Sequence, residues 1–451
     1  MKKKDLRNKM LAVMADVNTH VAEREELVEA IAIALLTRKN LFILGAPGQA
    51  KSYAINQFRV RITDARQFER LLSKQTDEDQ LFGRIDLASL VPGSVPLAVL
   101  ERNPQYQEMC GRLSTRLAAG GDPGDLPVQI ERQRKALAEL YGGEPTVNTA
   151  GKIPEADICF LDEIFKCNDG VLNSLLTALN ERKYTNEGRT YSIPTISFFA
   201  ASNEIPNFSD PQEKILEALY DRLELKLVTE DIAERANRMA ILQSKQQGQS
   251  GRITATMTLE ELLQMQAKVS TIPVPDAIND LADDVLCQLR KDGIRVSDRK
   301  YLNYYPIVQA KAWLSGHTVV EAQDLLILKH YLWDKPSDRA AVAATLERMC
   351  VNPMQDKVNS IRGMALEVQA EFTEALNAAD QSSAQSKVLI KLRGELLRLY
   401  KMQQELASVA QSDAEVKLTT DLLNDLEDIN RRAHEPLGYT YTPLAQMAAL
   451  T

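Results

Sequence analysis

The sequence predicts an α/β domain built on a parallel sheet with helices on both faces, followed by helical regions. Three short apolar runs, at 41–44, 158–161 and 196–201, each end in polar residues. A continuous apolar run of this length is typical of a strand buried on both faces of a parallel sheet. Helical patterns lie between the runs, which favours a doubly wound sheet. Because such sheets bind ligands at the carboxyl ends of their strands, the polar residues after each run are candidate site residues.

A helix is expected before the first strand, since apolar residues recur at helical spacing from Val21 to Leu36. Between 92 and 144 the α/β pattern breaks. Turn clusters at 91–96 and 120–124 bracket one helix-like stretch, and a charged helix is expected over about 129–141. We interpret 92–144 as an insertion into an α/β domain that spans 1–227.

Strand patterns end after Leu227, and helical periodicity broken by prolines continues to about Trp333. This predicts an all-helical lid domain at 228–335 and a C-terminal helical domain at 336–451. In the last region two apolar stripes with near-heptad spacing predict an antiparallel hairpin or small bundle. An ordinary bundle core and a coiled coil that docks a partner both fit these stripes.

The first apolar run leads directly into Gly45-Ala-Pro-Gly-Gln-Ala-Lys51-Ser52. Strand, glycine-containing loop and helix, in this order, are the context of a phosphate-binding P-loop. The glycines allow backbone N–H groups to surround phosphate oxygens, and the helix N-terminus adds a positive dipole end. Lys51 is predicted to reach the β- and γ-phosphates of ATP, and Ser52 to bind Mg²⁺. The predicted nucleotide contacts in this segment are Gly45, Ala46, Pro47, Gly48, Gln49, Ala50, Lys51, Ser52 and Tyr53.

Ala50 stands where the usual P-loop pattern has a glycine before the lysine. Its methyl group is tolerated if the backbone there is helical, whereas a positive φ would weaken binding. A plain glycine turn between strand and helix is the alternative to a P-loop, but it does not explain Lys51 and Ser52 at this offset.

Carboxylates and an amide follow the other two runs. Asp162 is the candidate for the Mg²⁺ shell, and Glu163 is the candidate base that polarises the attacking water, a role that requires a carboxylate within hydrogen-bond reach. Asn203 is expected to point into the same crevice and to orient the water or the γ-phosphate. A helix cap or turn is the alternative role of Asn203.

These motifs together resemble the MoxR family of AAA+ ATPases, and most closely its RavA-type branch, in which the P-loop alanine also occurs. The resemblance covers about 21–227 and rests on the P-loop and on the segments 158–165, 172–182, 201–206 and 217–222. It implies that Asn203 is the sensor 1 residue and that Arg222 is an arginine finger acting on the γ-phosphate of a neighbouring subunit. It further implies that Arg299, in a sensor 2 segment, contacts the nucleotide of its own chain.

The same resemblance implies a homo-oligomeric ring, usually a hexamer, with ATP at each subunit interface. It also implies a chaperone-like role with a von Willebrand factor A domain partner and a protein client. The sequence departs from the family in two places: the insertion that begins near Phe82 is enlarged by 92–144, and the helices after Pro336 do not match the RavA-type C-terminal region.

Composition limits the other function classes. The net charge of −8 and the pI of 5.4 disfavour a protein that coats nucleic acid. An AAA+ nucleic-acid motor or helicase loader stays the alternative function, and a nucleotide-gated scaffold is a third, against which Glu163 argues. The apolar stretches are shorter than the ~20 residues of a membrane span. Five cysteines without a C-x-x-C pair and four dispersed histidines disfavour a zinc site and lead us to expect reduced thiols in the cytoplasm.

Overall fold

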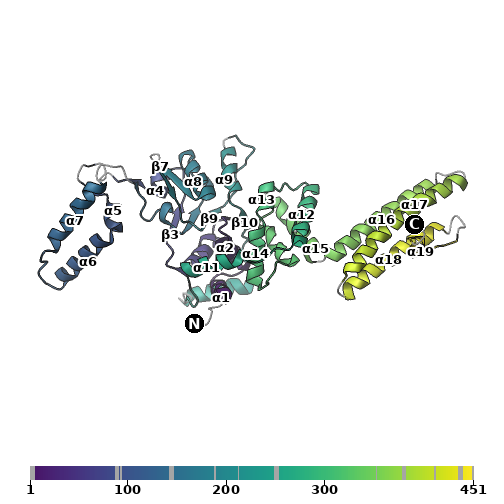
Figure 1. Ribbon diagram of the computed structural model, residues 1–451, viewed down its shortest axis with the longest axis horizontal. Helices are drawn as coiled ribbons and strands as arrows, with labels where there is room; N and C mark the ends of the chain where they lie inside the picture. The colour runs from purple at the N-terminus through teal and green to yellow at the C-terminus, as the bar shows by residue number, and fades with distance from the viewer. Residues whose placement is uncertain are drawn as a thin grey trace. The chain divides into compact units, whose positions relative to one another are not determined.

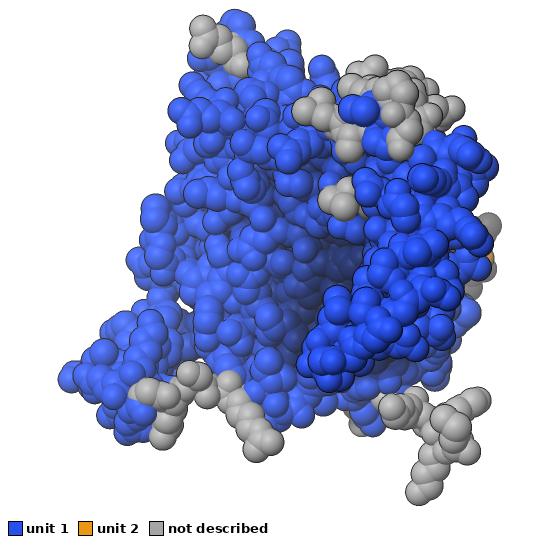
Figure 2. Space-filling view, turned by 90° about the vertical axis from the view of Figure 1, so that its left-hand side faces the viewer, with its two compact units in different colours: residues 1–275, 295–339 blue, residues 276–294, 340–451 orange. Residues whose placement is uncertain are grey.

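The computed structural model of the protein describes residues 6–86, 91, 94–141, 147–186, 189–211, 213–247, 253–351, 353–377, 382–410, 413–434 and 440–448. The chain divides into two compact units. Figure 1 labels the helices and strands, and Figure 2 shows one side of the first unit in blue. Unit 1 comprises 1–275 and 295–339, and unit 2 comprises 276–294 and 340–451. Among the described residues no helix is long and apolar enough to cross a membrane.

A five-stranded sheet is the centre of unit 1. Its order is β10-β1-β9-β6-β3, and neighbouring strands pair in parallel. The predicted α/β sheet is therefore confirmed. The apolar runs form its three inner strands, and two edge strands join them. The strands are β1 (Leu41–Leu44), β3 (Gln67–Leu71), β6 (Ile158–Asp162), β9 (Ser197–Ser202) and β10 (Leu225–Val228).

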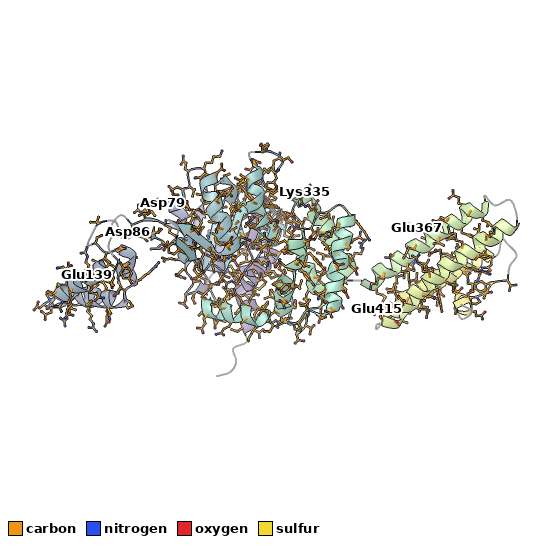
Figure 3. The ribbon with its side chains drawn as sticks, turned by 45° about the horizontal axis from the view of Figure 1, so that its top comes forward. Asp79, Asp86, Glu139, Lys335, Glu367 and Glu415 are labelled. Carbon is orange, nitrogen blue, oxygen red and sulfur yellow. The ribbon has the colours of Figure 1, made fainter. Side chains whose placement is uncertain are left out.

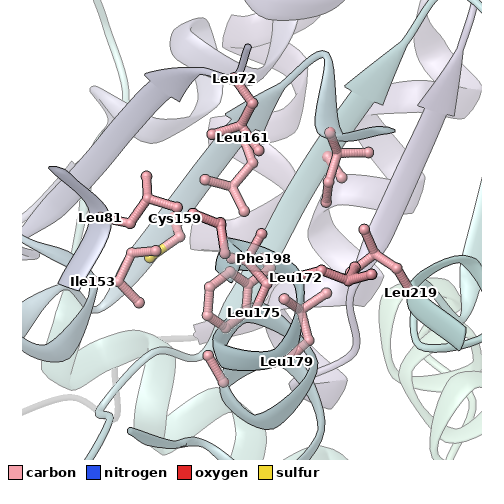
Figure 4. Packing of buried hydrophobic residues seen from close by; sticks show 14 of the residues in the cluster. Leu72, Leu81, Ile153, Cys159, Leu161, Leu172, Leu175, Leu179, Phe198 and Leu219 are labelled. Carbon is pink, nitrogen blue, oxygen red and sulfur yellow. The ribbon is translucent and has the colours of Figure 1, made fainter. Parts of the chain in front are cut away.

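Helices cover both faces of this sheet because alternate side chains of each strand point to opposite faces. On one face Leu161 and Phe198 pack against the leucines of α8 (Asp169–Glu181) (Figure 4). On the other face Ser197 Oγ donates to the Ala34 carbonyl of α2 (Glu25–Thr37) at 2.8 Å. The helix expected before the first strand is thus confirmed as α2. Its middle turns are buried almost completely, as a helix between a sheet and further helices requires.

Further helices of unit 1 surround α2. They are α1 (Leu6–Asn18), α3 (Lys51–Arg59), α11 (Leu259–Val269) and α14 (Tyr305–Ser315). The described residues form three two-stranded sheets outside the main one: β2 (Ile62–Thr63) with β11 (Met257–Thr258), β4 (Arg84–Ile85) with β5 (Val147–Asn148), and β7 (Lys183–Asn186) with β8 (Arg189–Ser192). The remaining short elements are α4 (Glu78–Phe82), α9 (Glu217–Asp221), α10 (Arg235–Gln246), α13 (Asp298–Leu302), η2 (Ile153–Glu155), η3 (Ile164–Lys166), η4 (Lys214–Leu216), η5 (Ala322–His330) and η6 (Pro336–Asp338).

The region read as an insertion contains α5 (Leu97–Arg102) and a hairpin of α6 (Pro104–Ala118) and α7 (Leu126–Tyr141). Both helices of the hairpin fall where helical patterns were predicted. No residue of α6 is buried, and side chains such as Glu139 of α7 point into solvent (Figure 3). The predicted limits of the insertion, 92 and 144, lie outside the described residues.

Unit 2 contains α12 (Asp276–Lys291), most of α15 (Arg339–Val351), and the long helices α16 (Pro353–Asn377), α17 (Ser382–Val409) and α18 (Asp413–His434), with α19 (Leu444–Ala448). The three long helices pack against one another through one apolar core that includes Leu396 and Leu426. Arg362 Nε donates to Asp425 Oδ2 at 2.7 Å across this bundle. The predicted small C-terminal bundle is confirmed.

Candidate functional site

The glycine-containing loop lies at the carboxyl end of β1. Gly45 N donates to the Ser202 carbonyl at 3.2 Å, which joins the loop to the end of β9. The Lys51 ammonium donates to the Gly45 carbonyl, to the Ala46 carbonyl at 3.0 Å and to Asn203 Oδ1 at 3.0 Å. Burial lowers the pKa of Lys51, while the charges of Asp162 and Glu163 oppose that shift. Lys51 is therefore a buried amine surrounded by oxygen atoms at the start of α3.

Ala50 has a left-handed backbone, with φ +59° and ψ +26°. Of the two alternatives for this position, a helical backbone and a positive φ, the structure has the positive φ. This conformation costs an L-residue roughly 1–2 kcal/mol. The methyl group therefore does not sit in ordinary helical geometry.

Ser52 and Asp162 meet at the adjacent strand end. Ser52 Oγ donates to Asp162 Oδ2 at 3.1 Å, although the two residues are 110 positions apart in the chain. A hydroxyl and a carboxylate are the oxygen donors that Mg²⁺ prefers. This pair of residues thus fits a magnesium ion.

Glu163 and Asn203 complete the cluster. Asn203 Nδ2 donates to Glu163 Oε1 at 2.6 Å, and Lys166 Nζ lies 3.2 Å from Glu163 Oε2. Asp162 is the last residue of β6, and Glu163, which follows it, has a positive φ of 53°. The Glu163 side chain therefore points away from the line of the strand. The structure brings Lys51, Ser52, Asp162, Glu163 and Asn203 together, as the sequence predicted for their strand ends.

A large cavity of about 1270 Å³ lies beside the P-loop. It is bounded by Gly48, Ala50 and Tyr53, by the segment 18–25 and by one side of α10. The carboxylate of Glu23 accepts from the backbone N–H groups of Ala233 and Glu234 at 2.7 and 2.9 Å, which fixes that segment to the start of α10. No motif in the sequence indicated that the segment 18–25 or α10 would line this cavity, because the packing of distant parts of the chain brings them beside the P-loop.

A further contact supports this side of the P-loop. Arg24 NH2 donates to the Glu230 carbonyl at 2.6 Å and to the Gln49 carbonyl at 3.3 Å. Gln49 in turn donates through Nε2 to Asp231 Oδ1 at 3.1 Å. Gln49 is therefore held by neighbouring loops, and its side chain faces the residues after β10.

Arg222 and Arg299 lie at the opposite end of the sheet. Asn40, which immediately precedes β1, donates to the Arg222 carbonyl at 2.9 Å, so Arg222 is at the amino end of the strands. Arg299 donates to Asn180 Oδ1 at 2.7 Å and lies 3.4 Å from Asp221 Oδ2. The four residues of β1 separate this end from the P-loop by roughly 13 Å of backbone. The structure does not bring either arginine to the P-loop of its own chain.

The two arginines share a small cavity of about 190 Å³. Its other lining residues are Arg38, Asn40, Leu179, Asn180, Arg182 and Glu224. Four guanidinium groups thus surround one cavity at the amino end of β1 and β10, and sequence inspection identified only two of them.

Beside this cavity Lys226 and Lys300 both contact Asp334. Asp334 Oδ1 lies 3.0 Å from Lys226 Nζ and also accepts from Lys300 at 2.5 Å. Burial lowers the pKa of Lys300 to about 7, and the charge of Lys226 acts in the same direction. The cluster joins β10 to the residues around Arg299, and its lysines gave no functional signal in the sequence.

Comparisons with known proteins agree with these motifs. A family model described as the MoxR domain in the MoxR-vWA-beta-propeller ternary systems matches residues 8–105 and 134–269. A model of an AAA lid domain matches 274–346. The match to the first model omits 106–133, which covers most of α6 and the first half of α7.

Two relatives come from Methanocaldococcus jannaschii. The uncharacterized protein MJ0079 is 27% identical over 342 residues, which are 76% of this chain and 74% of the relative. The uncharacterized protein MJ0812 is 27% identical over 364 residues, which are 81% and 79% of the two chains. Among solved structures, that of a candidate ATPase from Cytophaga hutchinsonii aligns with a TM-score of 0.53 at 14% identity, over 76% of this chain and 94% of that one. This last likeness concerns the fold alone.

Proposed function

Because the chain belongs to the MoxR family of AAA+ ATPases, we propose that it binds ATP with Mg²⁺ at the P-loop and hydrolyses it to ADP and phosphate. The observation that carries this proposal is the contact of Asn203 with both Lys51 and Glu163 at the carboxyl ends of β1, β6 and β9. A phosphate-binding cation, an amide and a carboxylate base are the groups that phosphoryl transfer to water requires within one crevice.

Each residue of the cluster has a distinct role in this proposal. The P-loop backbone from Gly45 to Ala50 surrounds the phosphates, and Lys51 neutralises the β- and γ-phosphate oxygens. Glu163 orients and polarises the attacking water, and Asn203 holds the Glu163 carboxylate in position. The cavity beside Tyr53 has the space to accept the base and ribose.

Ser52 and Asp162 are the proposed Mg²⁺ residues, Ser52 as a direct ligand and Asp162 in the metal shell. The bound ion would neutralise negative charge on the phosphate groups. Their 3.1 Å hydrogen bond keeps the hydroxyl and the carboxylate side by side, which is the arrangement that an oxygen-ligated ion needs.

The proposed active site is completed by a second copy of the chain in a ring, which we expect to be a hexamer. The position of Arg222 at the amino end of the sheet, from which it does not reach its own P-loop, supports this proposal. In a head-to-tail ring this end of one subunit faces the nucleotide of the next, and closure of the ring repeats the contact. We propose that Arg222 contacts the nucleotide of the neighbouring subunit. The contact of Arg299 with the nucleotide of its own chain stays a prediction of the sequence, since its guanidinium here lies beside Asn180 and Asp221.

The proposed task of ATP hydrolysis is remodelling of a protein client together with a von Willebrand factor A domain partner. Support comes from the matched family model, which is that of a MoxR domain in systems with a vWA component and a β-propeller. Placement in the RavA-type branch stays a prediction of the sequence. The acidic net charge of −8 disfavours the nucleic-acid motor that is the alternative.

Equilibrium binding and turnover test the nucleotide proposal together. The wild type should bind ATP in the presence of Mg²⁺ and release phosphate, and chelation of Mg²⁺ should stop the release. Lys51→Ala should lose binding, whereas Glu163→Gln should bind ATP with little release of phosphate. Equal phosphate release by wild type and Glu163→Gln would overturn the assigned chemistry.

A further inference from the structure

The cavity at the amino end of β1 and β10 contains one guanidinium that neither a motif nor an internal partner explains. We propose that Arg38 is a second residue that binds the phosphates of the nucleotide held by the neighbouring subunit, beside Arg222. This inference rests on the proposed function, because it requires that a neighbouring active site meets this end of the sheet.

The four arginines around this cavity have different partners. Arg182 donates to the carbonyl of Leu179 at 2.7 Å and to Asn40 Oδ1 at 2.8 Å, and it lies over the Phe198 ring. Arg299 contacts Asn180 and Asp221. Arg182 is held in place by several partners within its own chain, and the charge of Arg299 is paired with Asp221.

Arg38 and Arg222 differ from them. Arg222 donates to the Ala218 carbonyl at 2.7 Å and has no carboxylate partner within the described part of the chain, and its Nε is buried without an acceptor there. The exposed Arg38 guanidinium has neither a hydrogen bond nor an ion pair to any described residue. Both groups are therefore free to bind an anion at the shared cavity.

Local charge makes this cavity favourable for an anion. Burial lowers the pKa of Arg182 to about 10, Glu224 opposes the shift, and the positive charge of Arg38 adds to it. The Glu224 carboxylate is already bound to Lys39 at 3.0 Å and to the backbone N–H of Asn40. A planar guanidinium group can bind a phosphate group through two parallel hydrogen bonds.

The backbone of Arg38 points to the same role. Arg38 ends α2 in the left-handed conformation, with φ +57° and ψ +29°, where glycine or asparagine is preferred. A positive charge near a helix C-terminus is favourable, but an arginine one turn earlier would supply it without a left-handed backbone. The strained position is explained if the side chain must enter the cavity.

Replacement by glycine separates a phosphate-binding role from a structural one. Arg38→Gly removes the guanidinium and relieves the left-handed strain, so the variant should unfold at a temperature no lower than wild type. Its ATP hydrolysis should fall by about 100- to 1000-fold, the effect of losing one group that stabilises transition-state charge. Arg38→Lys, which keeps the charge, should retain more activity than Arg38→Gly. Wild-type hydrolysis by Arg38→Gly would overturn the inference.

Mixed rings test whether Arg38 acts on the neighbour. Glu163→Gln lacks the base but has Arg38, so mixing it with Arg38→Gly should restore hydrolysis at interfaces that join an intact base to an intact arginine. A mixture of Glu163→Gln with Arg222→Ala is the reference. Restoration in the reference alone would overturn the role of Arg38 and leave the shared site standing. Failure of both mixtures would contradict the shared site itself, and the inference with it.

Discussion

Asn203 donates its Nδ2 to Glu163 Oε1 at 2.6 Å, while its Oδ1 accepts from Lys51 at 3.0 Å. Only one orientation of the amide satisfies both partners, since the ammonium can only donate and the carboxylate can only accept. The amide thus couples the phosphate-binding lysine to the candidate base across three strand ends.

Loss of this amide should affect turnover more than binding. We expect Asn203→Ala to lower the rate of ATP hydrolysis by about 10- to 100-fold, since an unheld base is poorly positioned. Its affinity for ATP should stay within a few-fold of wild type. Asn203→Asp keeps an oxygen for Lys51 but cannot donate to Glu163, so it should be as slow as Asn203→Ala. Hydrolysis rates and equilibrium ATP binding of the two variants check this, and wild-type turnover by Asn203→Asp would contradict it.

The left-handed Ala50 gives a stability prediction. Ala50→Gly should raise the free energy of unfolding by about 0.5–1 kcal/mol, because relief of strain exceeds the added entropy of the unfolded chain. ATP affinity should not fall. Ala50→Val is the matched control and should destabilise, since a β-branched side chain fits this conformation poorly. Denaturant unfolding measures both, and equal stability of Ala50→Gly and Ala50→Val would refute the strain.

The Ser52–Asp162 pair should make hydrolysis depend on Mg²⁺. Asp162→Asn keeps the size of the side chain but removes its charge, so the concentration of Mg²⁺ that gives half-maximal hydrolysis should rise by about tenfold or more. Ser52→Thr keeps the hydroxyl and should remain close to wild type, whereas Ser52→Ala should not. Magnesium titration of the hydrolysis rate provides the check. An unchanged midpoint in Asp162→Asn would remove that residue from the metal shell.

His330 should make folding stability depend on pH. Burial lowers its pKa from 6.5 to about 4, although Glu26 opposes the shift. Between these two values the unfolded chain binds a proton that the folded chain does not, so stability rises as the pH rises from 4 to 6.5. His330→Phe should lose this component, and its stability relative to wild type should fall by on the order of 1–2 kcal/mol between pH 5 and pH 7. Parallel denaturation at the two pH values measures the change, and a constant difference would contradict a neutral buried histidine.

The inner strands could be predicted because their signal is local. β1, β6 and β9 are buried on both faces and are continuous apolar runs in the sequence. β3 was not predicted because, as an edge strand, it exposes Glu69 and Arg70. β10 was not predicted because Lys226 interrupts its apolar pattern. In the folded chain the charge of Lys226 is neutralised by Asp334, which lies 108 residues away in the sequence. A partner at that distance cannot be read from the strand itself.

The same distinction holds for the site. The P-loop and the polar strand ends lie together because parallel strands fix where their carboxyl ends meet. The left-handed Ala50 and the cavity formed with α10 depend on how distant loops pack, and no motif encodes them. Arg299 appears in a recognisable segment, but its position beside Asn180 and Asp221 depends on the placement of α13.

The central claim is that two copies of the chain complete each ATPase site, and its most direct test is hydrolysis per chain as a function of protein concentration. Wild type and Arg222→Ala should be compared over a wide range, with sizing chromatography in ATP at each concentration. We predict that wild-type turnover rises as the assembly forms, and that Arg222→Ala assembles but hydrolyses at least about 100-fold more slowly. Turnover that is independent of concentration, together with wild-type activity in Arg222→Ala, would contradict the claim and leave a self-contained P-loop enzyme.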